Sequence, residues 1–470
     1  MSVRHIVIIG GGFTGTALAI HLGRLGKAGL KVTVIEPREQ LAQGVAYSTN
    51  DPAHRINVPA MRMQLAGDEE GAFERWYRAS PAFQADPAAQ WLDGNIYPQR
   101  GQFARWVADQ FRQTVRHTSV VLNHVCDRAV AMHNGEVITA SGRRYQADEV
   151  VLAISHPPPA LPSLLSSLRH DPRIIADPWR RDALAGVGVN DRLAIIGLGL
   201  TMADVVASLN RQGFRGDIIA FSRRGQLPRP NLSGSYAPRA LEYQRPQQAT
   251  ARSWLRRIRD EVALAETVNQ PWQLIIDDIR LHGQQIWQQL SLNEQRRFLR
   301  HLRPWWDVHR YRIAPQVSAV LGELQAGETL QVLAARLKAV EVLSDSVTLT
   351  LQSRAGKTLT VEADKLVVTT GPAHGALLSS DTLLRQLTSE GVIQPDPLAL
   401  GIHVNAQSQV LNRQGDANPH LYVVGPAARA RFGELMGLPQ VAEHAESLAR
   451  QLLHLPLTTL KERCPPSLTD

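Results

Sequence analysis

Uninterrupted apolar runs that end in glycines occur twice along the chain. The runs are Ile6–Ile9 and Leu193–Ile196, and their branched apolar residues favour strands buried on both faces. Each run leads through a glycine-rich turn into a stretch with helical apolar spacing. A second apolar run follows each helix, at Lys31–Ile35 and at Asp217–Phe221. The pattern predicts two strand–turn–helix–strand units, which are typical of a parallel sheet.

The first turn carries glycines with the spacing GxGxxG, at Gly10, Gly12 and Gly15. In this arrangement the first glycine permits the tight turn, the second admits a pyrophosphate, and the third lets the helix pack closely on the strand. The free N–H groups at the helix N-terminus attract a phosphate. Glu36 ends the next strand, 24 residues after Gly12, where an acid receives the ribose hydroxyls of an adenosine. The unit therefore predicts a dinucleotide site.

The second turn repeats Gly197 and Gly199 but has Met202 at the third position. Its second strand ends in "SRRG", and Arg223 follows Gly199 by the same 24 residues. An arginine at the place of the acid suits a 2′-phosphate and hence NADP(H), whereas the alternative is a solvated basic turn. Across both units, the predicted cofactor-binding residues are Gly10, Gly12, Phe13, Thr14, Gly15, Glu36, Gly197, Gly199, Leu200, Thr201, Ser222, Arg223 and Arg224.

Each unit is followed by short alternating strands, the dipeptide "AD" and an apolar strand, within residues 119–155 and 329–371. We therefore expect an α/β fold with two Rossmann-like dinucleotide-binding domains, one for FAD and one for NADP, each with a β meander, plus a helical insertion. The expected division is 1–159 for the first part of the FAD-binding domain, 160–371 for the NADP-binding domain with the insertion at about 235–324, and 372–470 for the return of the FAD-binding domain.

The insertion is rich in tryptophan and arginine and has helical apolar spacing. One interpretation is a lid or substrate domain in which His309, Arg310 and Arg312 face an anionic substrate. The other is a helical cover whose tryptophans form its core.

Composition narrows the classes of function. The chain has 470 residues, 44% hydrophobic and 20% charged, which is ordinary for a globular protein, and its net charge of +8 is spread along the chain. The charge suits anionic ligands such as phosphates, and no nucleic-acid-binding motif or metal-ligand spacing accompanies it. Cys126 and Cys464 form no CxxC; we expect a buried thiol at Cys126 and a thiol in the tail. No signal peptide or run of 18 apolar residues is present, so we expect a cytoplasmic protein without membrane or nucleic-acid partners.

The order of these motifs resembles the flavoproteins with two dinucleotide-binding domains, a group that includes disulfide reductases and class B, N-hydroxylating-type flavin monooxygenases. Within that group the chain is similar to a bacterial branch of FAD/NAD(P)-binding proteins. The stretches that carry the resemblance are "GVAYSTNDPAHRINVPAMRM" (44–63), "GLGLTMADV" (197–205), "FSRRG" (221–225), "FLRHLRPWWDVHRYRIAP" (298–315), "LYVVGP" (421–426) and "GELMGLPQVAEHA" (433–445).

The resemblance implies that the 44–63 loop lies along the flavin. Asn57 and His54 are then the candidate catalytic residues, as a neutral hydrogen-bonding amide and a proton donor, with loop capping as the alternative for each. It also implies flavin contacts for Met61, for Gly425–Pro426, and for the helix that begins near Pro439. Many relatives have an aspartate where this chain has Pro426, and a proline cannot supply that carboxylate.

Two dinucleotide sites suggest hydride transfer from NADPH to FAD, and the missing CxxC disfavours a disulfide reductase. By resemblance, the expected activity is a monooxygenase that hydroxylates a small-molecule substrate through a C4a-hydroperoxyflavin. The alternatives are an NADPH-dependent flavin reductase or dehydrogenase with a different acceptor, and a flavin-binding sensor with little turnover.

Overall fold

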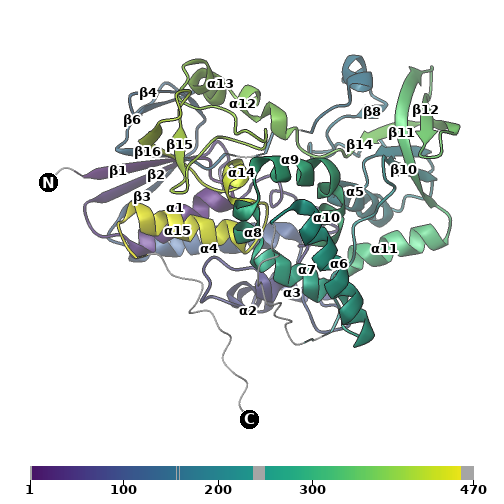
Figure 1. The fold of residues 1–470 in the computed structure, drawn as a ribbon, viewed down its shortest axis with the longest axis horizontal. Coiled ribbons are helices and arrows are strands. Elements are labelled where there is room, and N and C mark those ends of the chain that lie inside the picture. The colour runs from purple at the N-terminus through teal and green to yellow at the C-terminus, as the bar shows by residue number, and fades with distance from the viewer. Residues whose placement is uncertain (1–2, 155, 158, 235, 237–248, 457–470) are drawn as a thin grey trace, which may run out of the picture.

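The structure is a computed structural model that describes residues 3–154, 156–157, 159–234, 236 and 249–456. Cys464 and residues 237–248 of the expected insertion lie outside the described residues. Figure 1 shows two sheet-containing parts, at the left and right of the view, with a group of helices beside the seam between them.

The first sheet is built mainly from the N-terminal third of the chain. Its strand order is β15-β16-β7-β1-β2-β3, and all its pairs are parallel except β15–β16. The strands of this sheet are β1 (Arg4–Ile9), β2 (Leu30–Ile35), β3 (Val121–Val125), β7 (Glu149–Leu152), β15 (Gln409–Leu411) and β16 (Ala417–Val423). Strand β16 pairs with β7, so the C-terminal part of the chain returns to the sheet that the N-terminus begins.

Helices and a small meander surround this sheet. The meander is a separate antiparallel sheet of three strands, β4 (Ala129–His133), β5 (Glu136–Thr139) and β6 (Arg144–Gln146). The helices of this part are α1 (Phe13–Leu25), α2 (Ala72–Arg78), α3 (Pro81–Gln84), α4 (Arg100–His117), α12 (Leu377–Ser380), α13 (Thr382–Ser389), α14 (Arg429–Phe432) and α15 (Gln440–Leu452). Helix α1 packs against both α4 and α15.

The second sheet repeats the pattern. Its order is β13-β12-β11-β10-β9-β14-β8, parallel from β8 to β11 and antiparallel beyond. Its elements are β8 (Ile174–Ile175), β9 (Leu193–Ile196), α5 (Leu200–Arg211), β10 (Ile218–Ser222), β11 (Leu330–Val342), β12 (Val347–Ser353), β13 (Thr358–Ala363) and β14 (Lys365–Val368). The long strand β11 belongs to both parts of the sheet, because a register shift between Leu337 and Ala339 bends it.

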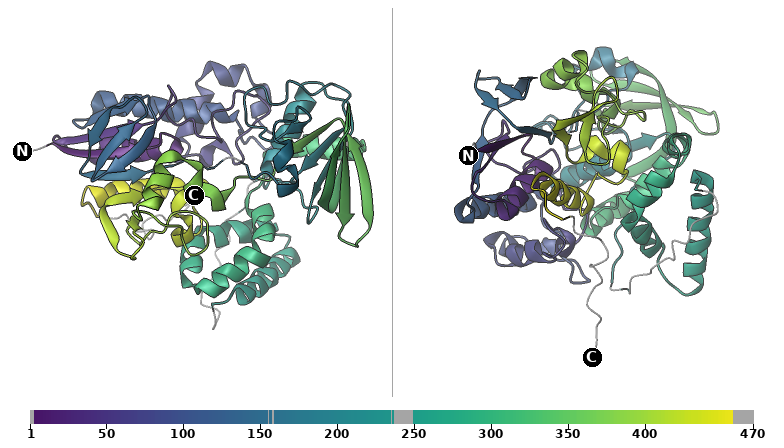
Figure 2. Two further views of the ribbon diagram at one scale, coloured as in Figure 1. Left: turned by 90° about the horizontal axis from the view of Figure 1, so that it is seen from above. Right: turned by 60° about the vertical axis from the view of Figure 1, so that its left-hand side comes forward.

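Among the described residues, six helices form the group between β10 and β11. They are α6 (Ala251–Thr267), α7 (Trp272–Leu281), α8 (Gly283–Gln289), α9 (Leu292–His301), α10 (Arg303–Arg310) and α11 (Pro315–Ala326). In both views of Figure 2 the teal helices of this insertion lie beside the two sheets rather than within either. Helix α11 packs against α5, and α8 packs against α14.

The chain crosses between the two sheets at neighbouring points. Pro159 pairs with Pro372 in an isolated bridge, and the Ala160 N–H donates to the Gly371 carbonyl at 3.1 Å. The Thr370 hydroxyl donates to the Ala160 carbonyl at 2.7 Å. The outward and the return crossing therefore support each other.

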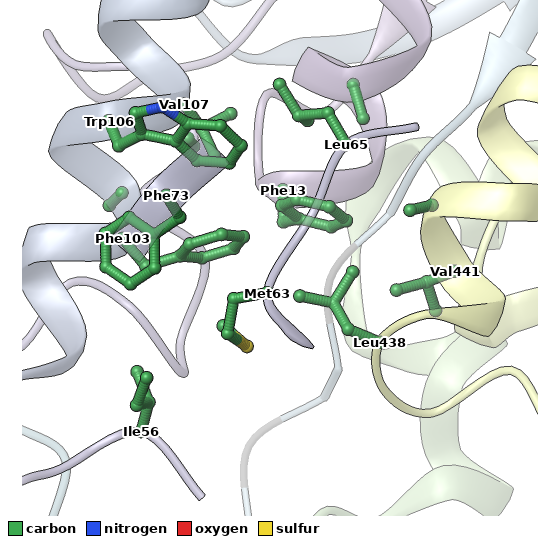
Figure 3. Close-up of a cluster of buried hydrophobic side chains, with 14 of the residues drawn as sticks. Phe13, Ile56, Met63, Leu65, Phe73, Phe103, Trp106, Val107, Leu438 and Val441 are labelled. Atoms are coloured by element: carbon green, nitrogen blue, oxygen red, sulfur yellow. The ribbon is translucent and has the colours of Figure 1, made fainter. Parts of the chain in front are cut away.

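Aromatic packing anchors the first sheet to the helices beside it. Figure 3 shows Phe13, Phe73, Phe103 and Trp106 in one buried cluster. The ring of Phe103 lies 5.4 Å from that of Phe13 and 5.1 Å from that of Phe73. Buried aromatic side chains contribute large apolar areas, so this cluster holds the start of α1 rigidly.

The expectation of a buried thiol at Cys126 was wrong, because Cys126 is exposed. It follows the last residue of β3, which is the edge strand of its sheet, and its thiol donates to the Pro37 carbonyl at 3.2 Å. In the described part of the chain, no helix is both long and apolar enough to cross a membrane. The described residues also contain no cluster of histidine, cysteine and acidic side chains that could hold a metal ion.

Candidate functional site

Two of the three glycines in the first turn are required by packing. Gly10 has φ +106°, and a Cβ there would lie 2.3 Å from the Ala153 carbonyl oxygen. A Cβ on Gly15 would lie 1.9 Å from the Gly10 oxygen. Gly12, the N-cap of α1, differs, since its Cβ would meet only Gly44 at 3.6 Å and beyond. Packing leaves Gly12 free, so the fold keeps space at the N-terminus of α1, where a pyrophosphate approaches.

Glu36 stands at the end of β2, as its spacing predicts, and is nearly fully buried. Its Oε2 accepts from the Gly11 N–H at 2.8 Å, while Oε1 accepts from the Arg38 N–H at 3.1 Å and from Arg38 Nη1 at 3.0 Å. The carboxylate is thus held beside the glycine turn in a fixed orientation. Sequence reasoning missed Arg38, although it follows Glu36 by only two residues.

The return segment meets this turn directly. Gly425 has φ +86°, and a Cβ on it would lie 2.9 Å from the Thr14 side chain. Pro426 begins a short 3-10 helix at that point. Helix α15 starts after its N-cap, Pro439, and packs along α1. The structure therefore brings the predicted residues 10–15, 36, 425–426 and 439 to one end of the first sheet.

His444 of α15 completes this arrangement and was not predicted as a site residue. Its Nδ1 accepts from the Gly425 N–H at 3.1 Å, and its Nε2 lies 2.8 Å from the Ser408 hydroxyl. A ring nitrogen that accepts a backbone N–H carries no proton, so His444 is neutral here. Burial lowers the pKa of His444 from the usual 6.5 to about 4. The only sequence signal was its place within the 433–445 motif.

We expect acid to loosen the Gly425 turn. Because the pKa of His444 is lower in the folded than in the unfolded chain, its stabilising contribution is complete above pH 6.5 and is lost as the pH falls toward about 4. The expected slope from this residue is about 1.4 kcal/mol per pH unit within that window. Thermal or urea unfolding measured from pH 7.5 to 4.5 checks it. His444→Gln should lower the slope of the unfolding free energy against pH by about 1.4 kcal/mol per pH unit. His420→Gln, at an exposed histidine, should leave that slope unchanged. Equal slopes for the parent and His444→Gln would contradict the assignment.

In the second turn, too, one glycine is required by packing and another is left free. Gly197 has φ +112°, and its Cβ would lie 2.5 Å from the Thr369 oxygen. Gly199, the N-cap of α5, has nothing within 4 Å of its Cβ position among the described residues, so space remains before Leu200 and Thr201. Met202, at the third glycine position, is fully buried in the core.

Arg223 and Arg224, which follow β10, have different surroundings. Ser222 ends the strand, and its hydroxyl accepts from the Gly225 N–H at 3.1 Å. Arg223 is exposed. The Arg224 guanidinium lies 5.8 Å from the ring centre of Trp305 in the insertion. Arg223 is therefore open to solvent, whereas Arg224 contacts α10.

The candidate catalytic residues lie at the seam between the two sheet domains. Both ring nitrogens of His54 are occupied, Nδ1 by the Thr49 hydroxyl at 2.7 Å and Nε2 by the Ser208 hydroxyl of α5 at 2.9 Å. Burial lowers the pKa of His54. His54 therefore bridges the 44–63 loop and α5.

Asn57 is held in place from two sides. Its Oδ1 accepts from Arg100 Nη2 at 3.1 Å, and its carbonyl accepts from the Asn231 side chain. Met61, four residues further on, is 48% exposed.

A buried ion pair across the seam was missed by sequence reasoning. Arg100, the first residue of α4, donates to Asp204 of α5 through Nη1 at 2.6 Å and Nη2 at 2.8 Å. The two residues are 6% and 3% exposed. Arg100 also donates to the Arg55 carbonyl at 2.7 Å. The Arg100 side chain thus links the 44–63 loop to α5, the helix that follows the second glycine turn.

The helical insertion contains an apolar cavity of about 620 Å³. Its volume falls within the range of roughly 300–1,000 Å³ that is usual for small-molecule sites. Tryptophans contribute to the wall, and of these Trp254 and Trp287 are buried while Trp305 is 47% exposed. The cavity is also lined by Arg429 and Glu434, which come from the segment between Gly425 and Pro439.

The arginines expected to face a substrate are buried. Arg310 donates to Glu434 at 3.0 Å through Nε, and Arg312 donates to Asp277. Both are 6% exposed. Neither arginine lines the apolar cavity, but Glu434, the partner of Arg310, does, so the charged contacts border the cavity.

Comparison with known proteins fits this geometry. Residues 7–157 match a family model described as FAD-NAD(P)-binding. The N-terminal segment is therefore similar to FAD-NAD(P)-binding domains. No curated protein sequence matches the chain.

Solved structures with the same fold cover nearly the whole chain. Ornithine hydroxylase from Pseudomonas aeruginosa is 14% identical, covers 96% of this chain and 99% of its own, and has a TM-score of 0.62. L-lysine 6-monooxygenase from Pseudomonas syringae is 16% identical over 97% and 99%, with a TM-score of 0.61. The cadaverine monooxygenase of Erwinia amylovora, solved with FAD, is 12% identical over 100% and 99%, with a TM-score of 0.64. These likenesses confirm the expected fold class, with two dinucleotide-binding domains.

Proposed function

We propose that the protein is an FAD-dependent, NADPH-reduced monooxygenase that hydroxylates a small molecule at nitrogen. The observation that carries the proposal is the pair of glycine turns, each with a backbone position at a helix N-terminus that packing leaves free, at Gly12 and Gly199. The whole-chain likeness to N-hydroxylating enzymes supports it, including a Kutzneria ornithine N-hydroxylase solved with reduced FAD, NADP+ and L-ornithine (TM-score 0.60, 16% identity).

Different residues would hold FAD and NADPH. The N–H groups that open α1 would receive the FAD pyrophosphate, and the Glu36 carboxylate would receive its ribose hydroxyls. The N–H groups that open α5 would receive the NADPH pyrophosphate, with Arg223 on the 2′-phosphate. When bound, the flavin supplies hydride acceptance and oxygen activation.

The protein itself would bind the two nucleotides, orient them and exclude water. The Arg100–Asp204 pair holds Asn57 against the helix of the NADPH site, so the two nucleotide sites keep a fixed relation. The insertion covers the seam between the two sheets (Figure 2), where it limits access of water to the reacting atoms.

The proposal is tested by mixing the FAD-loaded protein with NADPH, or with NADH, in the absence of oxygen. Rapid loss of the oxidised-flavin absorbance with NADPH is expected. Admission of oxygen with an amine substrate should then give a hydroxylamine, with little hydrogen peroxide. Reduction followed by quantitative peroxide with every amine would favour a reductase or oxidase, and no reduction by either nucleotide would favour a sensor.

Arg223→Gln is expected to lower kcat/KM for NADPH by about 10- to 100-fold and to leave that for NADH nearly unchanged, because the lost charged hydrogen bonds go only to the 2′-phosphate. Initial rates with each nucleotide measure the effect. Arg215→Gln removes an exposed arginine of the same domain and serves as the control for net charge. A parallel fall for both nucleotides would remove Arg223 from the 2′-phosphate site.

A further inference from the structure

Arginines from the insertion gather against the start of α15. Arg280 of α7 donates through Nη2 to the Leu438 carbonyl and to Gln440 Oε1, the latter at 3.2 Å. Arg310 lies beside Gly437, since a Cβ on that glycine would be 3.9 Å from Arg310 Nη2. We call Arg62, Arg280, Arg310 and Arg312 the arginine cluster.

The cluster carries more positive charge than its carboxylates balance. Among its neighbours, Glu434 accepts from Arg310, and Asp277 accepts from Arg312 and lies 3.9 Å from Arg62. Burial, followed by the charge of Arg310, lowers the pKa of Arg280 to about 9. The N-terminus of α15 adds the partial positive charge of a helix end. An anion at this place would be stabilised by both sources of charge.

Donors in the cluster remain unsatisfied. Arg280 Nε and Arg310 Nη2 are buried and have no hydrogen-bond partner among the described residues. Arg310 itself is 6% exposed and, through its Nε, already binds Glu434, so its free Nη2 is held in a fixed position. The buried hydroxyl of Tyr97 is also without a partner among the described residues; burial and the charge of Asp93 raise the pKa of this hydroxyl, whereas Arg62 and Arg312 lower it. Buried donors are normally paired, and fixed arginine donors match the two oxygens of a carboxylate.

The arginines of the cluster do not line the apolar cavity, although Glu434, which accepts from Arg310, does. Helix α7 has two faces here, with Ile276 and Ile279 lining the cavity and Asp277 and Arg280 in the cluster. Three of the four arginines come from the insertion, not from the segments that form the first glycine turn. The cluster therefore lies where the insertion meets the start of α15.

We propose that the arginine cluster binds a carboxylate of the substrate and so selects carboxylate-bearing amines. The inference rests on the proposed function for the identity of the molecule as substrate, but the anion site itself is tested by binding. Because the negative charge of a reduced flavin could use the same donors, the experiment separates that source from a substrate carboxylate.

The first arm measures binding to the FAD-loaded protein, after its flavin spectrum has shown that FAD is retained. Succinate is compared with succinamide, its neutral counterpart, by thermal shift and flavin difference spectra. Lysine is compared with cadaverine, which lacks only the carboxylate, by the same readouts and by amine-dependent NADPH oxidation. We expect tighter binding of the carboxylate member, and a loss of about 10- to 100-fold in Arg280→Gln and Arg310→Met. Arg300→Gln, at an exposed arginine of α9, should behave as the parent.

The outcomes are distinguishable. Failure of the parent to hold FAD would contradict the proposed function, whereas FAD retention without a carboxylate preference in either pair would overturn the anion site. Arg280→Gln serves where Arg310→Met fails to fold, because Arg280 pairs with no carboxylate in the described hydrogen bonds. If both variants keep the preference but show a lower flavin reduction potential, the cluster serves the reduced flavin, and the substrate assignment is wrong.

Discussion

Replacing Asp204 by alanine is expected to lower the free energy of unfolding by about 3 to 5 kcal/mol. Asp204 is 3% exposed and holds Arg100 through two hydrogen bonds of 2.6 and 2.8 Å. The variant leaves the Arg100 guanidinium buried without its counter-charge, and a buried charge without a partner is costly. Urea and thermal denaturation followed by tryptophan fluorescence measure the loss.

The chain offers a matched control at the same seam. Arg211 and Asp51 also join α5 to the 44–63 loop, at 3.2 Å, but the Arg211 side chain is 50% exposed. Asp51→Ala should therefore cost less than about 1 kcal/mol. The double variant Arg100→Met/Asp204→Leu should recover much of the loss, because it removes the unpaired charge. Similar losses in Asp51→Ala and Asp204→Ala would show that the buried pair contributes no more to the free energy of unfolding than the exposed pair.

Alanine at Gly12 or at Gly199 is expected to remove one nucleotide and spare the other. A Cβ at Gly12 would meet only Gly44, at 3.6 Å and beyond, and a Cβ at Gly199 would meet nothing within 4 Å among the described residues, so the fold should tolerate both. The added methyl group would occupy the space that the pyrophosphate needs. We expect Gly12→Ala to weaken FAD binding by about 10- to 100-fold, and Gly199→Ala to raise the KM for NADPH by a similar factor while FAD stays bound.

Gly15→Ala is the contrasting variant. Its Cβ would lie 1.9 Å from the Gly10 oxygen, so the whole N-terminal domain should be destabilised with or without FAD. Isothermal titration with FAD, stopped-flow reduction by NADPH and unfolding of the FAD-free protein separate the three cases. If Gly12→Ala and Gly199→Ala each lost both nucleotides, the assignment of one nucleotide to each turn would be contradicted.

The insertion illustrates where sequence patterns stop being informative. Its helical spacing was sufficient to predict helices, and the described helices run from Ala251 to Ala326. The pattern left open whether Arg310 and Arg312 face a ligand or a protein group, because burial and partners depend on segments distant in the chain. In the structure their carboxylate partners are Glu434, 124 residues away, and Asp277, 35 residues away.

His54 shows the same limit at a shorter range. Its residue type and its place in the loop suggested proton transfer, but both of its nitrogens are engaged, one by Ser208 at a distance of 154 residues in sequence. A single histidine in a loop carries no sign of which strand or helix will pack over it. The exposed Cys126 is a similar case, since the exposure of its thiol depends on β3 being an edge strand.

The sequence by itself determined the two strand–glycine turn–helix units. Glycine spacing, buried strands and the residue at the end of the second strand are local features, and their physical cause is the backbone conformation and close approach that only glycine permits. The tertiary structure alone decided the Arg100–Asp204 pair, the contact of His444 with Gly425 and the arginine cluster at α15. Each of these joins segments that leave no common pattern in the chain, because a buried charge or ring nitrogen is satisfied by whichever group the packed elements bring beside it.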